Sequence, residues 1–300
     1  MYKIDFKKPI HIHFIGIGGI SMSGLAEILL KENFKISGSD SRESELTDKL
    51  TRLGACVCYG QRASNITDDL DLVVYTAAIH PDNPELLAAS ERGIPTLTRA
   101  ELLGQIMDNY RESVAVAGTH GKTTTTSMIT DIFLQACADP TVSVGGILKS
   151  IDGNIRVGNS EVFLTEACEY TNSFLNFYPK YAVILNIEED HLDFFKDISD
   201  IRNSFHKFAE NVPADGTIII NGQIKNWKEI TSGLPCRIIT YGLDASDSYY
   251  ADNITFNTQG CGEFTLMHNS TALGTITLSV PGMHNVSNLS LIHISEPTRP

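Results

Sequence analysis

A glycine-rich segment in the middle of the chain has the residue types and spacing of a phosphate-binding loop. It follows the apolar run 114–117 and precedes a segment, 123–136, that reads as a helix. A strand, a glycine loop ending in Gly-Lys-Thr and a helix form the P-loop arrangement. Glycines let backbone N–H groups surround phosphate oxygens, and the helix N-terminus adds a partial positive charge. The residues expected to contact a nucleotide are Gly118, Thr119, His120, Gly121, Lys122, Thr123 and Thr124.

Two of these side chains have specific expected roles. Lys122 can reach the terminal phosphates, and the Thr123 hydroxyl can hold Mg²⁺. One position departs from the full P-loop signature, because Val116 stands where a glycine is expected five residues before Gly121. The flanking strand and helix favour the nucleotide-binding interpretation in spite of this departure.

Acidic residues follow two later apolar runs, 162–165 and 181–185, which read as strands. In a parallel sheet the carboxyl ends of the strands meet at the edge where phosphate binds. Mg²⁺ prefers oxygen ligands, so these carboxylates are candidate ligands, whereas a histidine is a poor Mg²⁺ ligand and would support a neighbour. The candidates are Glu166, Glu169, Glu188, Asp190, His191 and Asp193.

A second glycine turn lies near the N-terminus, after the expected strand 10–15. Apolar residues then recur at helical spacing, and an acidic residue stands about two dozen residues after the first glycine, where a ribose hydroxyl is commonly bound. The pattern predicts a ligand that contains phosphate and does not distinguish NAD, FAD or a nucleotide-sugar. The expected binding residues are Gly16, Gly18, Gly19 and Asp40, together with His80 at the carboxyl end of the expected strand 71–75.

The remaining pattern indicates an α/β protein of two domains. Strands and helices alternate up to residue 108, where a polar stretch marks a boundary, and the second domain begins at residue 109. Gly145-Gly146 predicts a turn after the P-loop helix, and three expected strands from residue 254 onwards form an antiparallel addition. Asn285 or Asn288 is expected to cap a helix, although no convincing helical run follows.

Composition limits the class of protein further. The net charge of −13 argues against a broad nucleic-acid surface. No two of the six cysteines form a Cys-x-x-Cys motif. We expect them to be small thiols in a reducing compartment. No apolar segment is long enough to span a bilayer, and the N-terminal run lacks the features of a signal peptide, so we expect a cytoplasmic protein.

Several motifs together resemble the Mur ligase family of bacterial peptidoglycan synthesis. Taken in order along the sequence, these motifs span nearly the whole chain. The family has a shorter loop, Gly-x-x-Gly-Lys-Thr, which explains why Val116 stands where the full P-loop signature has a glycine. The motifs are residues 13–20 (HFIGIGGI), 37–40 (SGSD), 117–124 (AGTHGKTT), 166–170 (EACEY), 186–193 (NIEEDHLD) and 281–285 (PGMHN).

The resemblance implies a reaction and a role for each domain. Residues 1–108 form a Rossmann-like domain that binds UDP-N-acetylmuramate through the first glycine turn, and residues 109–288 form a P-loop domain that binds ATP. The implied reaction joins L-alanine to the muramyl carboxylate through an acyl phosphate. Lys122 is then catalytic, Thr123 holds one Mg²⁺, and Glu169 and His191 are catalytic residues that hold a second. The family pattern places the adenine against His284, Asn285 and Asn288.

The sequence departs from the family after Asn288. The family continues into an alanine-rich helix and a third Rossmann-like domain that closes over the site, and residues 289–300 show neither. We expect this tail to be artefactual and the fragment to be poorly active, with weakened ATP binding. A family member that recycles muropeptides, a non-catalytic nucleotide-binding fragment and, from the first glycine turn alone, a nicotinamide oxidoreductase are the alternatives.

Overall fold

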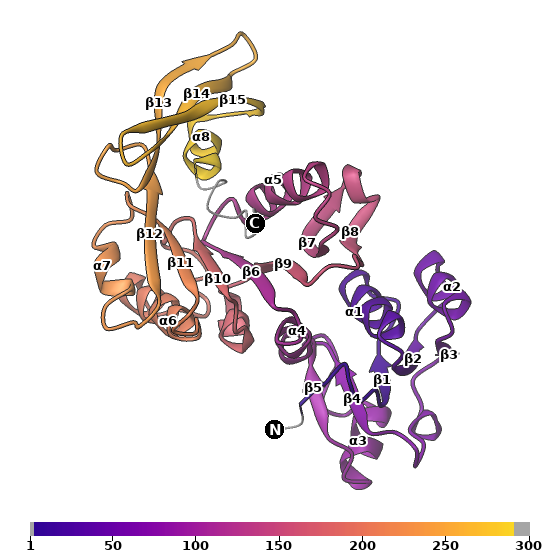
Figure 1. Cartoon of the computed structure of the whole chain (residues 1–300). Helices are drawn as coiled ribbons and strands as arrows, with labels where there is room; N and C mark the ends of the chain where they lie inside the picture. The colour runs from indigo at the N-terminus through magenta and orange to yellow at the C-terminus, as the bar shows by residue number, and fades with distance from the viewer. Residues whose placement is uncertain (1–2, 291–300) are drawn as a thin grey trace. The chain divides into compact units, whose positions relative to one another are not determined.

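The computed structural model describes residues 3–290, which form two α/β units (Figure 1). The first unit comprises residues 3–109 and Ile151–Val157, and the second comprises Tyr110–Ser150 and residues 158–290. The short segment Ile151–Val157 therefore belongs with the first unit, although the sequence interpretation assigned it to the second. Within residues 3–290, no helix combines the length and the hydrophobicity needed to cross a membrane.

The first unit is a five-stranded parallel sheet with the order β3-β2-β1-β4-β5. The central position of β1, with β2 on one side and β4 on the other, is the topological switch point at which doubly wound sheets bind ligands. Its strands are β1 (His11–Ile15), β2 (Lys35–Asp40), β3 (Cys56–Tyr59), β4 (Leu72–Tyr75) and β5 (Thr96–Thr98). Its helices are α1 (Ile20–Lys31), α2 (Glu45–Arg52), η1 (Ala63–Asn65), α3 (Pro84–Glu91) and α4 (Arg99–Met107), and the segment 151–157 adds β8 (Gly153–Arg156).

The second unit contains a larger sheet in which strands follow the order β15-β14-β13-β12-β11-β10-β6-β9-β7. Its strands are β6 (Glu112–Ala117), β7 (Thr141–Leu148), β9 (Val162–Ala167), β10 (Tyr181–Ile184), β11 (Thr217–Asn221), β12 (Arg237–Gly242), β13 (Tyr249–Phe256), β14 (Cys261–His268) and β15 (Thr271–Pro281). Its helices are α5 (Lys122–Gln135), η2 (Lys149–Ile151), η3 (Tyr170–Asn176), α6 (Ile198–Glu210), α7 (Trp227–Ile230) and α8 (Met283–Leu289).

Strand β6 leads into the P-loop and lies between β9 and β10, as Figure 1 also shows. Both neighbours run parallel to it, and Ala117 at the end of β6 pairs with Ala167 of β9 and Ile184 of β10. The loops that follow β9 and β10 therefore begin beside the P-loop. This arrangement confirms the expected edge at which the two acidic segments meet.

The prediction of a turn at Gly145-Gly146 is wrong, because β7 continues through both glycines to Leu148. Both glycines lie close to side chains of neighbouring elements. A Cβ on Gly145 would stand 2.7 Å from a carboxylate oxygen of Glu166, and one on Gly146 would stand 3.3 Å from the methyl of Thr123. The glycine pair lets β7 pass close to the start of the P-loop helix.

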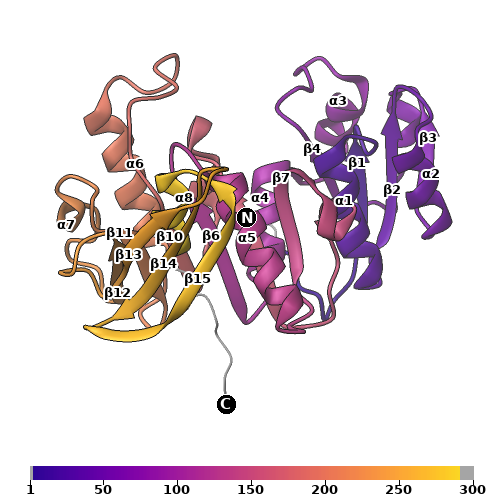
Figure 2. The ribbon, with the colours of Figure 1, turned by 90° about the horizontal axis from the view of Figure 1, so that it is seen from above.

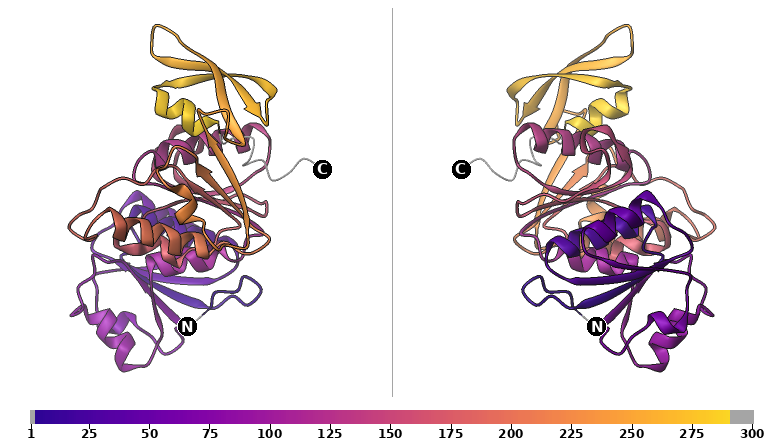
Figure 3. Two further views of the ribbon diagram at one scale, coloured as in Figure 1. Left: turned by 90° about the vertical axis from the view of Figure 1, so that its left-hand side faces the viewer. Right: turned by 90° about the vertical axis from the view of Figure 1, so that its right-hand side faces the viewer.

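The last part of the second unit is antiparallel, as the sequence pattern predicted. Strands β13, β14 and β15 pair in that order, and α8 packs against them (Figure 2 and Figure 3). Their shared core includes Phe264, Leu278, Val286 and Leu289, and Met128 and Ile132 of α5 border it. This core attaches α8 to the helix that follows the P-loop.

The structure corrects the prediction for residues 283–290. Asn285 and Asn288 lie inside α8, which begins after Gly282, so neither caps the helix. Leu289 and Ser290, which the sequence interpretation assigned to an artefactual tail, are buried, and Leu289 is part of the core described above. Residues 291–300, the rest of that tail, lie outside the described residues.

The shared core of β13–β15 and α8 can be tested by truncating Phe264, which is 1% exposed. We expect Phe264→Ala to lower the free energy of unfolding by about 3 kcal/mol or more, because it leaves a cavity among buried side chains. Phe256→Ala in the same sheet is the control, since Phe256 is 45% exposed and its loss should cost less than about 0.5 kcal/mol. Urea denaturation measures both, and equal losses would contradict the proposed core.

Candidate functional site

The loop from Gly118 to Gly121 adopts a backbone that its two glycines permit. Gly118 has φ +152°, and a Cβ there would stand 2.9 Å from the Cβ of Leu185. Gly121 has φ +82° and is the N-cap of α5, with no side-chain cap. The first N–H groups of α5 therefore have no side-chain acceptor at the N-cap, which is the arrangement that binds phosphate.

Asn186 fixes this loop from the end of the neighbouring strand β10. Its Oδ1 accepts the backbone N–H of His120 at 2.8 Å, and its Nδ2 donates to the His120 carbonyl at 2.9 Å. The Thr119 hydroxyl accepts the N–H of Glu188 at 2.9 Å. Sequence reasoning assigned no role to Asn186, and its position directly after the apolar run 181–185 is the signal that could have found it.

Lys122 and Glu169 form a largely buried ion pair beneath the loop. The Lys122 Nζ donates to the two oxygens of Glu169 at 2.8 and 3.2 Å and also to the carbonyls of Gly118 and Thr119. The Glu169 side chain is 2% exposed, so its charge needs such a partner. His191 lies on the other side of this carboxylate, with its Nε2 3.6 Å from Oε1. The structure thus brings together the three residues expected to be catalytic.

The carboxylate next to Thr123 is Glu166, not Glu169. The Thr123 hydroxyl donates to Glu166 Oε2 at 3.0 Å, and the N–H of Gly145 donates to Oε1 at 2.6 Å. Burial raises the pKa of Glu166, and it outweighs the opposing effects of these two hydrogen bonds and of the Lys122 charge. Glu166 and Glu169 were both candidate ligands on spacing, and the family resemblance assigned only Glu169, together with His191, to a second Mg²⁺.

The oxygen donors of the site fit Mg²⁺ better than a transition metal. Within residues 3–290 no group of three His, Cys, Asp or Glu side chains is arranged to hold a metal ion. Mg²⁺ typically uses one or two protein carboxylates and completes its shell with water and phosphate oxygens. The pair Thr123–Glu166 provides such a partial set of oxygens, whereas Glu169 is paired with the ring of His191, a nitrogen donor that Mg²⁺ does not prefer.

The other acidic candidates lie on the loop after β10. Glu188 is exposed, and its carboxylate lies 3.8 Å from the ring of His120. Asp190 accepts the N–H of His191, whereas Asp193 accepts the hydroxyl of Tyr170 at 2.8 Å. The ring of Tyr170 also packs on His191, with centroids 4.6 Å apart. These contacts hold His191, which has φ +51°, beside Glu169.

A cavity of about 570 Å³ adjoins the P-loop. The expected nucleotide contacts His120, Gly121, Thr124, His284 and Asn288 line it, together with Asn186, Asn221, Leu243 and Ser287. Asn285 is not among the lining residues. It is buried in α8, where its Nδ2 donates to the carbonyl of Pro281 at 2.8 Å.

The glycine turn of the first unit and Asp40 are in direct contact. Gly16 has φ +81°, and the N–H of Gly18 donates to Asp40 Oδ2 at 2.8 Å. Gly19 is the N-cap of α1 and, like Gly121, provides no side-chain cap. His80 is exposed in the segment after β4, and its carbonyl accepts the N–H of Asn83.

The helices at the two glycine loops differ from the other helices of eight or more residues in the described chain. Helices α1 and α5 have a glycine N-cap and no acidic residue in the first turn. Helices α2, α3, α4 and α6 are capped by the side chains of Ser44, Asn83, Thr98 and Asp197, and each has an acidic residue in its first turn. A carboxylate at an N-terminus occupies the place of an anionic ligand, so α1 and α5 are the two helices prepared to bind one.

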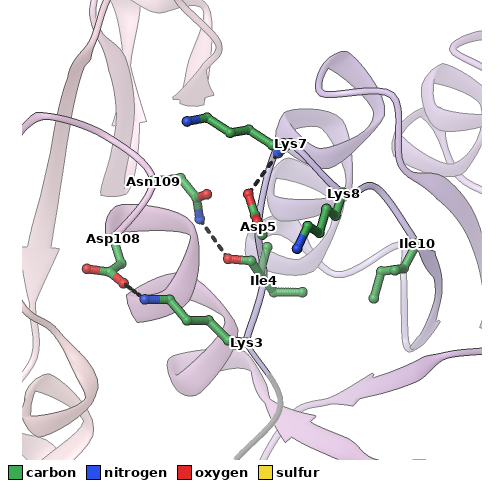
Figure 4. Close-up of a pocket in the computed structure, with 8 residues that line it drawn as sticks. All are labelled: Lys3, Ile4, Asp5, Lys7, Lys8, Ile10, Asp108 and Asn109. Atoms are coloured by element: carbon green, nitrogen blue, oxygen red, sulfur yellow. Dashed lines mark hydrogen bonds and ion pairs between the residues drawn. The ribbon is translucent and has the colours of Figure 1, made fainter.

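Another cavity of the first unit, of about 750 Å³, has a different lining (Figure 4). It lies between the N-terminal segment and the end of α4, where Lys3 pairs with Asp108 and Asn109 donates to the carbonyl of Ile4. None of the residues expected to bind substrate or nucleotide lines it. It is therefore separate from the glycine turn and its ligand-binding residues.

Comparison with known proteins identifies both units. The pattern described as "Mur ligase family, catalytic domain" matches residues 11–111, and that of the "Mur ligase middle domain" matches residues 116–293. Two curated relatives, from Agathobacter rectalis and Lachnospira eligens, are named UDP-N-acetylmuramate–L-alanine ligase and are 66% and 60% identical over 96% of this chain. The chain spans 63% of the length of each.

Solved structures show the same fold. A UDP-N-acetylmuramate–alanine ligase from Thermotoga maritima, 31% identical, superposes with a TM-score of 0.75 over 95% of this chain and 64% of that one. A UDP-N-acetylmuramate:L-alanyl-γ-D-glutamyl-meso-diaminopimelate ligase from Neisseria meningitides, 27% identical, gives a TM-score of 0.82 over 96% of this chain and 93% of that one. The two matched domains show that the chain belongs to the Mur ligase family.

Proposed function

We propose that this chain is part of an ATP-dependent ligase that joins L-alanine to UDP-N-acetylmuramate during peptidoglycan precursor synthesis in the bacterial cytoplasm. The observation that carries the proposal is the pair of helix N-termini, α1 and α5, that lack side-chain caps and acidic residues. One stands on each unit, as expected for an enzyme that binds two separate phosphate-containing substrates. The names of the relatives that are 66% and 60% identical support the choice of substrates.

The second unit would bind ATP, which supplies the phosphoryl group. The P-loop backbone and the N-terminus of α5 would bind the phosphates, and Lys122 would neutralise charge on the transferring group. The adenine would occupy the cavity lined by His284 and Asn288. Asn285, which the family pattern also associates with adenine, would act from within α8 by holding the carbonyl of Pro281.

Two sets of side chains would hold Mg²⁺, which neutralises charge on the phosphates when bound. Thr123 and Glu166 would hold one ion together, since the two side chains are 3.0 Å apart. Glu169 and His191 would hold a second ion, following the family pattern, and their 3.6 Å contact supports this assignment. With an ion beside Glu169, the carboxylate would no longer need Lys122 as its partner. The Lys122 ammonium group would then be free to contact the phosphate.

The proposed reaction has two steps. The muramyl carboxylate attacks the γ-phosphorus, the bond to the bridging oxygen breaks, and ADP leaves with its electron pair. The amine of L-alanine then attacks the carbonyl carbon of the acyl phosphate to give a tetrahedral intermediate, which loses phosphate with its electron pair and one amine proton to solvent. Both steps bring anions together, so positioning and charge neutralisation are the main requirements of the site.

The uridine diphosphate would bind at the first glycine turn. The N-terminus of α1 after Gly19 would meet the diphosphate, and Asp40 at the end of β2 would be near the ribose. His80 would reach the sugar from the segment after β4. A thermal-shift comparison tests this assignment: UDP-N-acetylmuramate should raise the melting temperature and NAD should not. Protection by NAD alone would contradict it.

The acceptor amino acid is the second point to test. A ligase for a tripeptide acceptor has the same fold at 27% identity, whereas the alanine ligases are up to 66% identical. We therefore expect L-alanine, and not the tripeptide, to stimulate the low phosphate release expected of this chain with ATP and UDP-N-acetylmuramate. A coupled phosphate assay with L-alanine or L-alanyl-γ-D-glutamyl-meso-diaminopimelate compares the two acceptors, and stimulation by the tripeptide alone would favour the recycling reaction.

The anchoring of the P-loop by Asn186 makes the next prediction. We expect Asn186→Ala to weaken ATP binding by about tenfold, because two hydrogen bonds that fix His120 are lost. Gln259→Ala is the control, since Gln259 is exposed in the same unit and does not line the cavity. Calorimetric titration with ATP measures both variants, and an unchanged affinity in Asn186→Ala would contradict the anchoring role.

The role of Thr123 can be separated from nucleotide binding in general. We expect Thr123→Val to lower ATP affinity by about tenfold in Mg²⁺ and to leave it unchanged in EDTA, because only the hydroxyl is removed. Ser127→Ala is the matched control, since its hydroxyl donates to the Thr123 carbonyl one turn along α5. A loss of equal size with and without Mg²⁺ would show that the hydroxyl does not act through the metal.

A further inference from the structure

A carboxylate to which the proposed substrate and nucleotide sites assign no role is fully buried in the first unit. Glu85, in the first turn of α3, is 0% exposed. Its Oε2 accepts the hydroxyl of Ser39 at 2.6 Å, and its Oε1 accepts the side-chain amide of Asn65 at 2.5 Å. The ring of His13, itself 1% exposed, has its Nε2 3.7 Å from Oε1. Three neighbouring polar groups thus surround one buried carboxylate.

Such a group is costly to bury unless its hydrogen bonds are satisfied. Burial acts to raise the pKa of Glu85, but the nearby His13 ring and the hydrogen bonds from Ser39 and Asn65 outweigh it and keep the pKa below its usual value. The helix does not require this carboxylate as a cap, because the side chain of Asn83 already accepts the N–H groups of Glu85 and Leu86. The carboxylate is therefore not needed to cap α3, although its charge lies at the positive end of that helix.

Ser39 connects this carboxylate with the glycine turn. Its hydroxyl donates to Glu85, and its carbonyl accepts the N–H groups of Gly16 and Ile17 at 2.8 and 3.0 Å. The next residue, Asp40, accepts the N–H of Gly18. Three successive N–H groups of the turn are thus bonded to two residues at the end of β2.

We infer that Glu85 is a positioning residue for the UDP-sugar site: through Ser39 it fixes the end of β2, and with it the glycine turn that directs the N-terminus of α1 at the diphosphate. The inference rests on the proposed function of the first unit as the UDP-N-acetylmuramate site. Asn65 supports the same arrangement from the other side, because its amide also donates to the carbonyl of Gly60, whose N–H donates to the carbonyl of Asp40. The end of β2 is therefore held both through Ser39 and through Asp40.

The chain offers a matched control for this role. Ser37 stands two residues before Ser39 on the same strand, and its hydroxyl bonds to the rings of His11 and His13 at 3.1 and 3.0 Å. Neither of these bonds reaches Glu85 or the turn directly. Ser37→Ala and Ser39→Ala each remove a hydroxyl from the same polar region, and only the second breaks the connection to the turn.

The test measures the turn itself and its ligand in the full chain. Hydrogen exchange at the amides of residues 16–18 reports the anchoring without ligand. Calorimetric titration with UDP-N-acetylmuramate, and separately with Mg-ATP, reports each site. We expect Ser39→Ala and Glu85→Gln to speed exchange at the turn and weaken UDP-N-acetylmuramate binding by about tenfold, with Mg-ATP binding unchanged. Ser37→Ala should change each quantity less than about twofold.

The outcomes separate this inference from the function on which it rests. Equal effects of Ser37→Ala and Ser39→Ala, or no effect of Ser39→Ala, would overturn the positioning role. If Glu85→Gln does not fold, Ser39→Ala decides the matter alone. If the unaltered chain does not bind UDP-N-acetylmuramate, the proposed substrate fails and the inferred role for that ligand fails with it. Faster exchange in Ser39→Ala would in that case still show that Ser39 anchors the turn.

Discussion

The parallel pairing of β6 between β9 and β10 is the constraint on which the nucleotide site depends. Ala117 pairs with Ala167 and Ile184, so the segments that follow β6, β9 and β10 leave the sheet at the same edge. The P-loop, the Glu169 segment and the Asn186 segment are then neighbours by register alone. A shift in register would separate Lys122 from Glu169 and His120 from Asn186, and the buried charge of Glu169 would lose its partner.

The two glycine loops follow one physical plan. In each, polar groups at the end of a neighbouring strand accept backbone N–H groups of the loop: Ser39 and Asp40 in the first unit, Asn186 in the second. The loop is thereby fixed before any ligand binds, which reduces the entropic cost of binding. The helix that follows has a glycine N-cap and no acidic first turn, so its N-terminal charge is available to an anion.

Local patterns predicted the parts of the fold whose signals are local. The P-loop, the first glycine turn and the acidic segments after the apolar runs were placed on the expected elements, because strand and helix periodicity and glycine spacing determine them. Gly145-Gly146 was misread as a turn because its cause is a contact with Glu166 and Thr123, which are distant in sequence. Helix α8 was missed for a similar reason, since its stability comes from packing against β13–β15.

In the candidate site, too, local motifs predicted some features, and others depend on contacts between residues distant in sequence. The role of Lys122 followed from the P-loop motif, whereas the roles of Glu169 and His191 rested on resemblance. The proximity of the three residues required the register of three strands. The pairing of Thr123 with Glu166 is set by side-chain direction at the end of β9, which spacing does not specify. Glu85 gave no signal in the sequence, because an acidic residue in the first turn of a helix is ordinary and only its burial marks it as unusual.

The central claim is that the two units carry two separate anion sites, one for each phosphate-containing substrate. Calorimetric titration of the chain with UDP-N-acetylmuramate, before and after saturation with Mg-ATP, tests it most directly. The account predicts one equivalent of each ligand, with UDP-N-acetylmuramate still bound when Mg-ATP is saturating. Displacement of one ligand by the other, or failure of UDP-N-acetylmuramate to bind, would contradict it.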